Sequence, residues 1–411
     1  MTWTFWKDSV ICSQAILTAK ENYLIKQGLR LSDPNTAQKT YWKILNSFLN
    51  KCKLPKIPPL FLNSSFVINC KEKASIFNNY FASQCTPFIN SSTLPDFSVF
   101  TDNSLSSFDI TDNEIKDLLL GIDTNKAHGP DKISTRMIHL CGSSLVRPLK
   151  IIFMNIIHTG IFPSSWKKAN VTPIHKKGDK QLHNNYRPIS LLPIFAIFKH
   201  LYNHLMTNNL ISKNQSGFRP GDSCTNQLLS LINDIHKAFD DKNCLEIRSV
   251  YLDMSKAFDK VWHDGLLFKL KQNGINGKLL SLLQNYLTDR HQRVVLNGQS
   301  SEWAIIKSGV PQGSVLGPLL FLIFINDLEA NLTCQVKVFA DDRSLFTIVK
   351  NPETAALNLN KDLDFIAKWA FQWKMSFNTD PTKQAQEILF SCKKSSPCIL
   401  PFILTILLLN E

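Results

Sequence analysis

Apolar and polar residues alternate from Cys334 to Val338 and again from Ser344 to Val349, with Phe339-Ala340-Asp341-Asp342 between the two runs. A period of two is typical of β-strands, so the pattern predicts two antiparallel strands joined by a tight turn. This turn presents two adjacent carboxylates at its tip. Because such carboxylates repel each other, their shared position favours a bound cation, although a solvated acidic turn has the same pattern.

A second strand is predicted from Ser249 to Asp253, where β-branched and aromatic residues lead into a third carboxylate. An Asp at the carboxyl end of a buried strand is typical of a binding site, because the strand fixes its position and the loop beyond leaves room for a ligand. We expect a helix to begin shortly after this strand. As the N-cap of that helix, Asp259 is better placed than Asp253.

A glycine-rich loop, Ser308 to Ser314, precedes a strongly apolar helix predicted from Val315 to Ile325. Its two glycines and one proline suit close approach of the backbone to a ligand, and Ser314 is able to cap the helix. Taken alone, this stretch indicates only a turn.

Helical periodicity dominates residues 1–105, where Asp33-Pro34 is expected to open one helix and Lys71 to Ser83 to form another. The aromatic residues of the second helix, among them Phe77 and Phe81, are more typical of a core than of a nucleic-acid platform. A capping box at Thr111 and Glu114 predicts the start of another helix. Four further helices are predicted: one from Ser143 to Thr159 that ends at Gly160, two that end near Gly274 and at Leu287, and one from Leu357 to Trp373. A hairpin is predicted to turn at Asn297-Gly298, and a strand to run from Glu387 to Ser391.

The 411 residues are 44% hydrophobic and 19% charged, a composition that excludes a disordered chain. The net charge of +13 predicts an anionic partner, with nucleic acid as the first candidate and a membrane surface as the second. The ten cysteines include no Cys-x-x-Cys pair, so neither a zinc site nor a disulfide framework is indicated and a reducing, intracellular setting fits best. The apolar end, Ile399 to Leu409, is too short to cross a bilayer as a helix.

Basic residues concentrate between Lys167 and Arg187, on a segment that reads as strand, turn and strand. Charge alone leaves two interpretations open: a solvated face, or a surface that contacts an anionic ligand. The basic residues of the run are Lys167, Lys168, Lys176, Lys177, Lys180 and Arg187, against the single acid Asp179.

The acidic hairpin, the strand ending at Asp253 and the loop at Ser308–Ser314 resemble, in this order and spacing, the palm motifs of reverse transcriptases of non-LTR (LINE-type) retrotransposons. Asn185 to Pro193 and Gln215 to Pro220 are similar to the fingers motifs of that group. Trp373 to Asn378, with Lys383, resembles the motif that follows the acidic hairpin. The resemblance runs from about residue 127 to residue 390.

The resemblance implies an α+β right-hand polymerase fold, with fingers and a palm whose antiparallel sheet packs on helices. It implies a mainly helical connector over residues 1–105 and a reverse transcriptase domain over residues 106–391, and no endonuclease domain is recognised. Residues 392–411 resemble no thumb and look like a truncated or degenerate apolar tail.

The implied activity is RNA-directed DNA polymerisation by two-metal nucleotidyl transfer. By resemblance, Asp253, Asp341 and Asp342 hold Mg²⁺, with Mn²⁺ as a substitute, and Lys383 protonates the leaving pyrophosphate, although a surface lysine is an equal interpretation. The fingers residues Lys176, Lys177 and Arg187 are implied to contact the incoming triphosphate, Phe258 to select deoxynucleotides, and Gln312 and Gly313 to lie near the template base and the nucleotide. The implied partners are an RNA template, a DNA primer and dNTPs, without a membrane, in the nucleus or cytoplasm.

Three departures from the family pattern favour an alternative. Fewer residues than in the family pattern surround Phe195, Arg343 replaces a small hydroxyl residue after the two aspartates, and no thumb is recognised. A guanidinium at the metal site would compete with cations, unless it points away along the strand. The alternative is therefore a catalytically degenerate fragment that binds nucleic acid only, and a third hypothesis is a host-recruited structural protein.

Overall fold

The computed structural model describes residues 2–34, 36–48, 57–85, 94–95, 100–124, 129–191, 197–242, 244, 246–378 and 385–391. The chain divides into two compact units, residues 1–58 and residues 59–411. The boundary expected at residue 105 stays a prediction.

The first unit contains two helices that contact each other, α1 (Thr2–Ser32) and α2 (Gln38–Phe48). The helix expected to open at Asp33-Pro34 therefore begins at Gln38 instead. Thr36 explains part of the difference, because its hydroxyl donates to the Arg30 carbonyl and its amide to the Asp33 carbonyl, so this stretch closes the end of α1.

The second unit contains an antiparallel four-stranded sheet, which corresponds to the expected palm. Its strand order is β11-β5-β10-β9, and every neighbouring pair is antiparallel. The acidic hairpin thus places β10 in the middle of the sheet, beside the strand that ends at Asp253. The strands are β5 (Glu246–Asp253), β9 (Gln335–Phe339), β10 (Asp342–Val349) and β11 (Gln386–Phe390).

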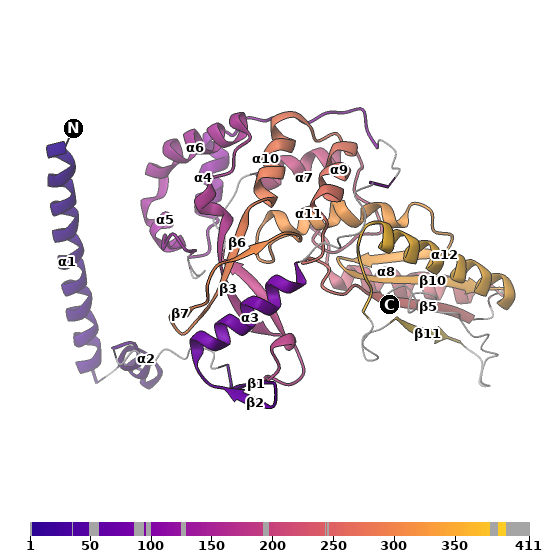
Figure 1. Cartoon of the computed structure of the whole chain (residues 1–411), viewed down its shortest axis with the longest axis horizontal. Helices are drawn as coiled ribbons and strands as arrows, with labels where there is room; N and C mark the ends of the chain where they lie inside the picture. The colour runs from indigo at the N-terminus through magenta and orange to yellow at the C-terminus, as the bar shows by residue number, and fades with distance from the viewer. Residues whose placement is uncertain are drawn as a thin grey trace. The chain divides into compact units, whose positions relative to one another are not determined.

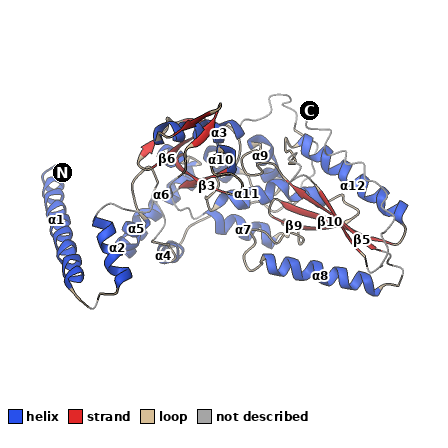
Figure 2. Ribbon diagram, turned by 90° about the horizontal axis from the view of Figure 1, so that it is seen from below, coloured by secondary structure: helices blue, strands red, loops and turns tan. Residues whose placement is uncertain are grey.

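Helices cover both faces of this sheet (Figure 2). On one face, α8 (Cys224–Asp240) packs Ala238 against Ile247 and Phe346. On the other, α12 (Pro352–Gln372) and α11 (Leu316–Ile325) build the main hydrophobic core, and α11 is buried along almost its whole length. This burial explains why the sequence of α11 is apolar all round rather than on one side.

A second, mixed sheet corresponds to the expected fingers. It has the order β4-β3-β6-β7, β8 also pairs with β6, and β3 and β6 are parallel. Figure 1 shows α3 (Cys70–Gln84) lying across this sheet, where Phe77 packs edge-on against Tyr186 with ring centroids 4.8 Å apart. Phe77 and Phe81 are buried, so the core interpretation of this aromatic stripe is confirmed. The strands are β3 (Lys168–His175), β4 (Tyr186–Leu191), β6 (Arg290–Leu296), β7 (Gln299–Ser300) and β8 (Ala304–Ile306).

A short hairpin, β1 (Leu60–Leu62) and β2 (Ser65–Val67), lies within residues 1–105, which the sequence predicts to be mainly helical. Its turn residues Asn63 and Ser64 both have positive φ, at 48° and 63°. The Phe61 amide donates to the Gln181 carbonyl at 3.0 Å, which attaches the hairpin to the fingers.

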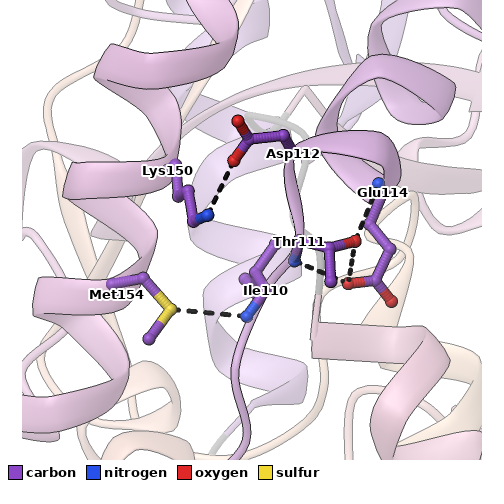
Figure 3. A network of polar contacts seen from close by, with 6 residues as sticks. All are labelled: Ile110, Thr111, Asp112, Glu114, Lys150 and Met154. Atoms are coloured by element: carbon purple, nitrogen blue, oxygen red, sulfur yellow. Dashed lines mark hydrogen bonds and ion pairs between the residues drawn. The ribbon is translucent and has the colours of Figure 1, made fainter.

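The capping box predicted at Thr111 and Glu114 is present at the start of α4 (Asp112–Leu120), where each side chain accepts from the other residue's backbone amide (Figure 3). Figure 3 also shows the ion pair of Lys150 with Asp112, at 2.7 Å, which joins α6 (Val146–Thr159) to α4.

The helix expected from Ser143 is longer and is interrupted. It runs as α5 (Thr135–Cys141), a 3₁₀ turn η1 (Gly142–Leu145) and α6 (Val146–Thr159), and ends at Gly160 with a left-handed φ of 71°, as predicted. By length and composition alone the run Thr135–Thr159 could cross a membrane, and α6 packs against α4 and α10. The expected lack of a membrane partner stays a prediction.

Two of the remaining helices, α9 and α10, end close to the predicted positions near Gly274 and at Leu287, whereas no bounds were predicted for α7. The hairpin at Asn297-Gly298 is present as well, with φ values of 49° and 80°. The mixture of a helical core with an antiparallel sheet confirms the expected α+β class. The helices are α7 (Ile197–Thr207), α9 (His263–Gln272) and α10 (Gly277–Leu287), with 3₁₀ turns η2 (Ser164–Lys167), η3 (His183–Asn185) and η4 (Asn326–Glu329).

Candidate active site

The sheet register brings the predicted carboxylates together. Asp342, the first residue of β10, is the direct antiparallel partner of Asp253, the last residue of β5. Directly paired residues have Cα atoms about 4.5–5.5 Å apart and side chains on the same face. Asp341 lies next to them in the turn, after Ala340, whose φ of 59° is left-handed. Asp341 and Asp342, which follow Asp253 by 88 and 89 positions in the sequence, therefore form one acidic edge with it, because β10 begins where β5 ends.

The charges of this edge influence one another. Partial burial, and then the charges of Asp341 and Asp253, raise the pKa of Asp342, while Lys176 and Arg187 oppose the rise. Burial and the nearby Arg187 lower the pKa of Lys176, and Asp253 and Asp341 counteract this shift. Fingers cations and palm carboxylates are thus close enough to affect each other's ionisation.

The chemistry of the three carboxylates suits a divalent metal ion. Carboxylate oxygens are hard ligands that suit Mg²⁺ and Mn²⁺. Mutual repulsion is visible in the raised pKa of Asp342, and a cation would relieve it. Within the described ranges, no group of three or more His, Cys, Asp or Glu side chains is arranged to hold a metal ion. The fit of these three carboxylates to a metal therefore rests on their chemistry and on the edge that they share.

Two amide side chains hold the acidic edge in place. Asn378 donates from Nδ2 to Asp253 Oδ2 at 3.1 Å and from its backbone to the Asp253 carbonyl at 2.9 Å. Gln215 is buried, and its Oε1 accepts from the amides of Ala340 at 2.9 Å and Gly217 at 2.8 Å. Asn378 therefore orients one carboxylate, and Gln215 fixes the turn that carries the other two.

The predicted fingers cations lie at the tip of the β3–β4 hairpin. Lys176 and Lys177 follow β3 in the turn, and the Lys176 amide donates to the Asn185 carbonyl at 2.9 Å. Arg187 is on β4, paired with Ile174. The strand, turn and strand expected for the basic run are confirmed.

Gln312 and Gly313 join the loop after β8 to the fingers. The Ser190 amide of β4 donates to the Gln312 carbonyl at 2.8 Å. Gly313 has a φ of 98°, and a Cβ at this position would lie 2.7 Å from the Ser190 carbonyl oxygen, so only glycine allows this approach. Ser314 Oγ accepts from the Gly317 amide at 2.8 Å in the first turn of α11, but the N-cap residue itself is Val315 and not the predicted Ser314.

The expectation that Asp259 caps a helix is wrong. A series of turns follows β5, and α9 begins only at His263, with Trp262 at its N-cap. Asp259 is buried instead and accepts a hydrogen bond from Gln312 Nε2 at 2.9 Å. Burial raises its pKa to about 6, against the opposing effects of Lys256 and the Gln312 hydrogen bond.

Phe258 is half-buried and stacks on Phe321, with ring centroids 4.6 Å apart and an interplanar angle of 21°. Phe218, from the fingers motif, meets its edge at 5.7 Å. The ring is thus held between the fingers motif and the core helix α11, five residues beyond Asp253.

A cavity of about 450 Å³ lies between α8 and the acidic face of the palm sheet. Its lining includes Asp253, Asp342 and Lys177, together with Gln227 and Tyr251. Pockets for small ligands occupy about 300–1,000 Å³, so a ligand of nucleotide size fits beside the carboxylates.

Arg343 points away from the acidic edge. Successive strand residues face opposite sides of a sheet, so Arg343 enters the core when Asp342 faces the cavity. Its side chain is 3% exposed, and Nη1 donates to Met254 Sδ at 3.3 Å. Burial lowers its pKa to about 10, and the charges of Glu329, Asp327 and Asp341 oppose the shift. The sequence left two orientations open for the Arg343 side chain, toward the carboxylates or away from them, and the structure shows the one that points away.

Some predicted features lie outside the described residues, namely Lys383, the apparent loss around Phe195 and the tail of residues 392–411. No sequence pattern predicted roles for Gln215, Asn378 or Ser190. Gln215 and Asn378 stand within motifs that the resemblance identified, but their hydrogen bonds each span 125 residues and leave no local signal.

Comparisons with known proteins agree with this geometry. Residues 174–394 match the family described as reverse transcriptase (RNA-dependent DNA polymerase), and this range contains Asp253, Asp341 and Asp342. The RNA-directed DNA polymerase from mobile element jockey of Drosophila melanogaster is 32% identical over 286 residues, which cover 66% of this chain and 31% of that protein. The probable RNA-directed DNA polymerase from transposon BS of the same organism is 29% identical over 391 residues, covering 90% of this chain and 42% of that protein.

The chain thus spans roughly a third to two fifths of the length of these relatives. Among solved structures, apo telomerase from Candida tropicalis, truncated from its C-terminal domain, is similar with a TM-score of 0.40 and 12% identity, over 62% of this chain and 57% of that one. The family match covers more than half of the chain and confirms both the resemblance and the expected right-hand polymerase fold. The chain belongs to the reverse transcriptase (RNA-dependent DNA polymerase) family.

Proposed function

We propose that this chain is the polymerase core of a non-LTR retrotransposon reverse transcriptase, which extends a DNA primer on an RNA template with dNTPs. The observation that carries the proposal is the register of the palm sheet, which pairs Asp253 with Asp342 and places Asp341 in the adjoining turn. The similarity to RNA-directed DNA polymerases of mobile elements supports the same activity.

In this proposal Asp253 and Asp341 hold two divalent cations, Mg²⁺ or in its place Mn²⁺, and Asp342 supports one of them. Such a pair of ions would supply positive charge to the attacking and leaving oxygens of an in-line displacement. The chain's own part is to fix the carboxylates before substrate arrives, through Asn378 on Asp253 and Gln215 beneath the turn.

The fingers supply positive charge for the triphosphate. Lys176 and Lys177 act as point charges and Arg187 as a planar, bidentate donor. The charge effect of Arg187 and Lys176 on Asp342 supports their position opposite the carboxylates. Lys383 remains the predicted proton donor to the leaving pyrophosphate.

The remaining residues position the nucleotide. Phe258, clamped by Phe321 and Phe218, is the proposed gate whose ring excludes a 2′-hydroxyl. Gln312 and Gly313 are proposed to line the template base and the nucleotide, a role supported by their position between palm and fingers. A nuclear or cytoplasmic location and the lack of a membrane partner follow from this function and stay predictions.

The test is primer extension on an RNA template with dNTPs and Mg²⁺, repeated with Mn²⁺. Asp341→Ala is expected to lower the extension rate by about 10³-fold or more, because it removes several kcal/mol of charge stabilisation in the transition state. RNA binding should change little. Asp364→Ala is the matched control, since Asp364 is a partly exposed carboxylate on α12 whose pair is Lys368.

Extension by the parent and the control, but not by Asp341→Ala, supports the two-metal assignment. Equal extension rates for the parent and Asp341→Ala would contradict the two-metal assignment. A parent that binds RNA but extends no primer with either metal would replace the proposal with the alternative, a degenerate fragment that binds nucleic acid only.

A further inference from the structure

A second, much smaller cavity lies where the palm meets the fingers. Its volume is about 40 Å³, and its walls are β4, β6, the loop that carries Gln312, and Cys85 at the C-terminal end of α3. One water-sized group needs roughly 10–15 Å³ of such a volume, so the cavity excludes a nucleotide or any other organic ligand. Its size therefore fits a single small ion or a solvent molecule.

Buried hydrogen-bond donors of β6 line this cavity. Arg290 and Gln292 lie on the same face of β6, two positions apart, and are 4% and 8% exposed. Among the residues that the structure describes, Arg290 Nη2 and Gln292 Nε2 have no hydrogen-bond partner. Buried donors in this state are rare because each one is unfavourable, and a charged donor is more so. Both side chains therefore require an acceptor inside the cavity.

The Arg290 guanidinium is held in place from its other side. Nη1 donates to the Tyr286 carbonyl at 3.0 Å, and the guanidinium carbon lies 4.8 Å from the centroid of the Tyr286 ring. A carbonyl and a ring orient the group but leave its full positive charge. No carboxylate of the described residues forms an ion pair with Arg290. Because a buried cation without a counter-charge is unfavourable, an acceptor with negative charge fits better than a neutral one.

Asp259 lines the same cavity, but it has cations of its own. Its carboxylate accepts from Gln312 Nε2 at 2.9 Å. Burial raises the pKa of Asp259, and the cations that oppose this rise are Lys256 and Lys260. The negative charge on this wall is thus already balanced without Arg290.

The surroundings of Arg290 add further positive charge. Burial lowers the pKa of Lys167 and of His263, and the nearby charge of Arg290 contributes to both shifts. The charges of Asp289 on Lys167 and of Asp264 on His263 oppose them. An anion beside Arg290 would relieve the repulsion among these basic groups.

We propose that this cavity binds one small monovalent anion, with chloride as the ion of suitable size. The anion accepts hydrogen bonds from Arg290 and Gln292 on β6 and lies against the loop that joins the palm to the fingers. Its binding therefore stabilises the folded chain. The site is separate from the acidic edge, so this inference and the proposed polymerase activity can fail independently.

The experiment measures the melting temperature of the full chain in sodium chloride and in sodium bromide. Sodium gluconate keeps the ionic strength constant, since gluconate is too large for the cavity. A ligand that binds only the folded state stabilises it with the logarithm of its concentration. Above the dissociation constant, the melting temperature should therefore rise by about 2–3 °C for each tenfold increase in halide. The line width of chloride in chlorine NMR measures binding directly.

Two variants remove the donors one at a time. Arg290→Met keeps most of the side-chain volume and should abolish the response to halide. Gln292→Met leaves the charge in place and should weaken halide binding about tenfold, so it decides the question if Arg290→Met does not fold. Arg136→Met and Gln299→Met are the matched controls, because both residues are exposed and lie outside the cavity. They should respond to halide as the parent does.

Asp259→Asn distinguishes an anion from ordered water. At about pH 7.5 the parent carries a negative charge on this wall, because the pKa of Asp259 is about 6. Removing that charge should strengthen halide binding about tenfold, whereas a water molecule would give no such response.

Three results would overturn the site. Equal melting temperatures in halide and in gluconate would identify ordered water as the occupant. A halide response that persists in both Arg290→Met and Gln292→Met would place the ion elsewhere on the chain. Unchanged halide affinity in Asp259→Asn would contradict an anion beside this carboxyl group. None of these measurements depends on primer extension.

Discussion

For a single residue such as Arg343, the face of the strand on which its side chain lies decides whether that side chain reaches the acidic edge or the core. Its backbone adjoins the acidic turn, yet its guanidinium is buried against Met254 on the far side of β10. Asp327 and Glu329, both in η4, and Asp341 oppose the effect of burial on its pKa. The arginine is therefore a buried component of the core behind the site, and not a competitor for the metal.

Arg343→Thr, which restores the small hydroxyl residue of the family pattern, is expected to leave the extension rate at or below that of the parent. Its free energy of unfolding should fall by about 2–4 kcal/mol, because a large buried side chain is lost and nearby carboxylates lose a compensating charge. Urea unfolding and primer extension measure the two effects.

Arg343→Met is the matched control, since it keeps most of the volume and the contact with Met254. We expect a smaller loss of stability than for Arg343→Thr. A clear gain of activity in Arg343→Thr would show that the guanidinium does inhibit the site.

At the scale of elements, the acidic hairpin depends on a segment that is not part of its sheet. Residues 214–217 run parallel to β9, with the Ser216 amide donating to the Val338 carbonyl at 3.0 Å and the Val338 amide to the Asn214 carbonyl at 3.1 Å. Gly217 touches the turn itself, since a Cβ there would lie 2.2 Å from the Ala340 nitrogen. The fingers motif therefore fixes the turn that carries Asp341.

Gln215→Met is expected to raise the Mg²⁺ concentration required for half-maximal extension about tenfold or more. The substitution keeps the side-chain volume but removes the acceptor of two buried amides, and loss of an outer-shell partner commonly costs 10–100-fold in metal affinity. A Mg²⁺ titration of the extension rate, below the melting temperature of the variant, measures this effect.

Gln372→Met, at the exposed end of α12, is the control for the loss of a glutamine. A merely structural role for Gln215 would lower the melting temperature and leave the Mg²⁺ dependence unchanged. That outcome would contradict positioning of Asp341 by this side chain.

The elements that the sequence predicted well are those specified by local patterns. The acidic hairpin, α3 and the Asn297-Gly298 hairpin are each specified by periodicity and turn residues within about 20 positions. The β1–β2 hairpin was missed because its strands are three residues long and its turn, Asn63-Ser64, contains no glycine.

The site was predictable only as far as the family motifs extend. They identified Asp253, Asp341 and Asp342, but pairing of Asp253 with Asp342 depends on tertiary register. Asp259 was misassigned because its local context suits an N-cap, and a hydrogen bond to Gln312, 53 residues away, overrides that preference. Contacts of such range have no periodicity to detect.

At the scale of the whole second unit, the loop around Gln312 joins the palm to the fingers. On one side Gln312 donates to Asp259, and on the other its carbonyl accepts from Ser190 of β4. Ser308 Oγ also donates to the Asp259 carbonyl, at 3.0 Å. The protonation state of the buried Asp259 carboxyl therefore affects the hydrogen bonds that connect the palm sheet with the fingers sheet.

Burial raises the pKa of Asp259 to about 6, from a usual value near 4. The folded chain therefore binds this proton more tightly than the unfolded chain, so the associated stability is complete below about pH 4 and is lost as the pH rises through about 6. Asp259→Asn cannot titrate and keeps an acceptor for Gln312. Relative to this variant, the parent's free energy of unfolding should fall by up to about 3 kcal/mol between pH 4 and pH 7.

Urea unfolding of both proteins across this pH range measures the difference, and Asp364→Asn serves as the exposed control. A constant offset between parent and Asp259→Asn would reflect packing alone and would contradict the raised pKa. A difference that grows with pH would show that an ionised Asp259 weakens the joint. Gln312 contacts both Asp259 and Ser190. The free-energy cost of burying the ionised Asp259 would then weaken the contact between the palm and the fingers.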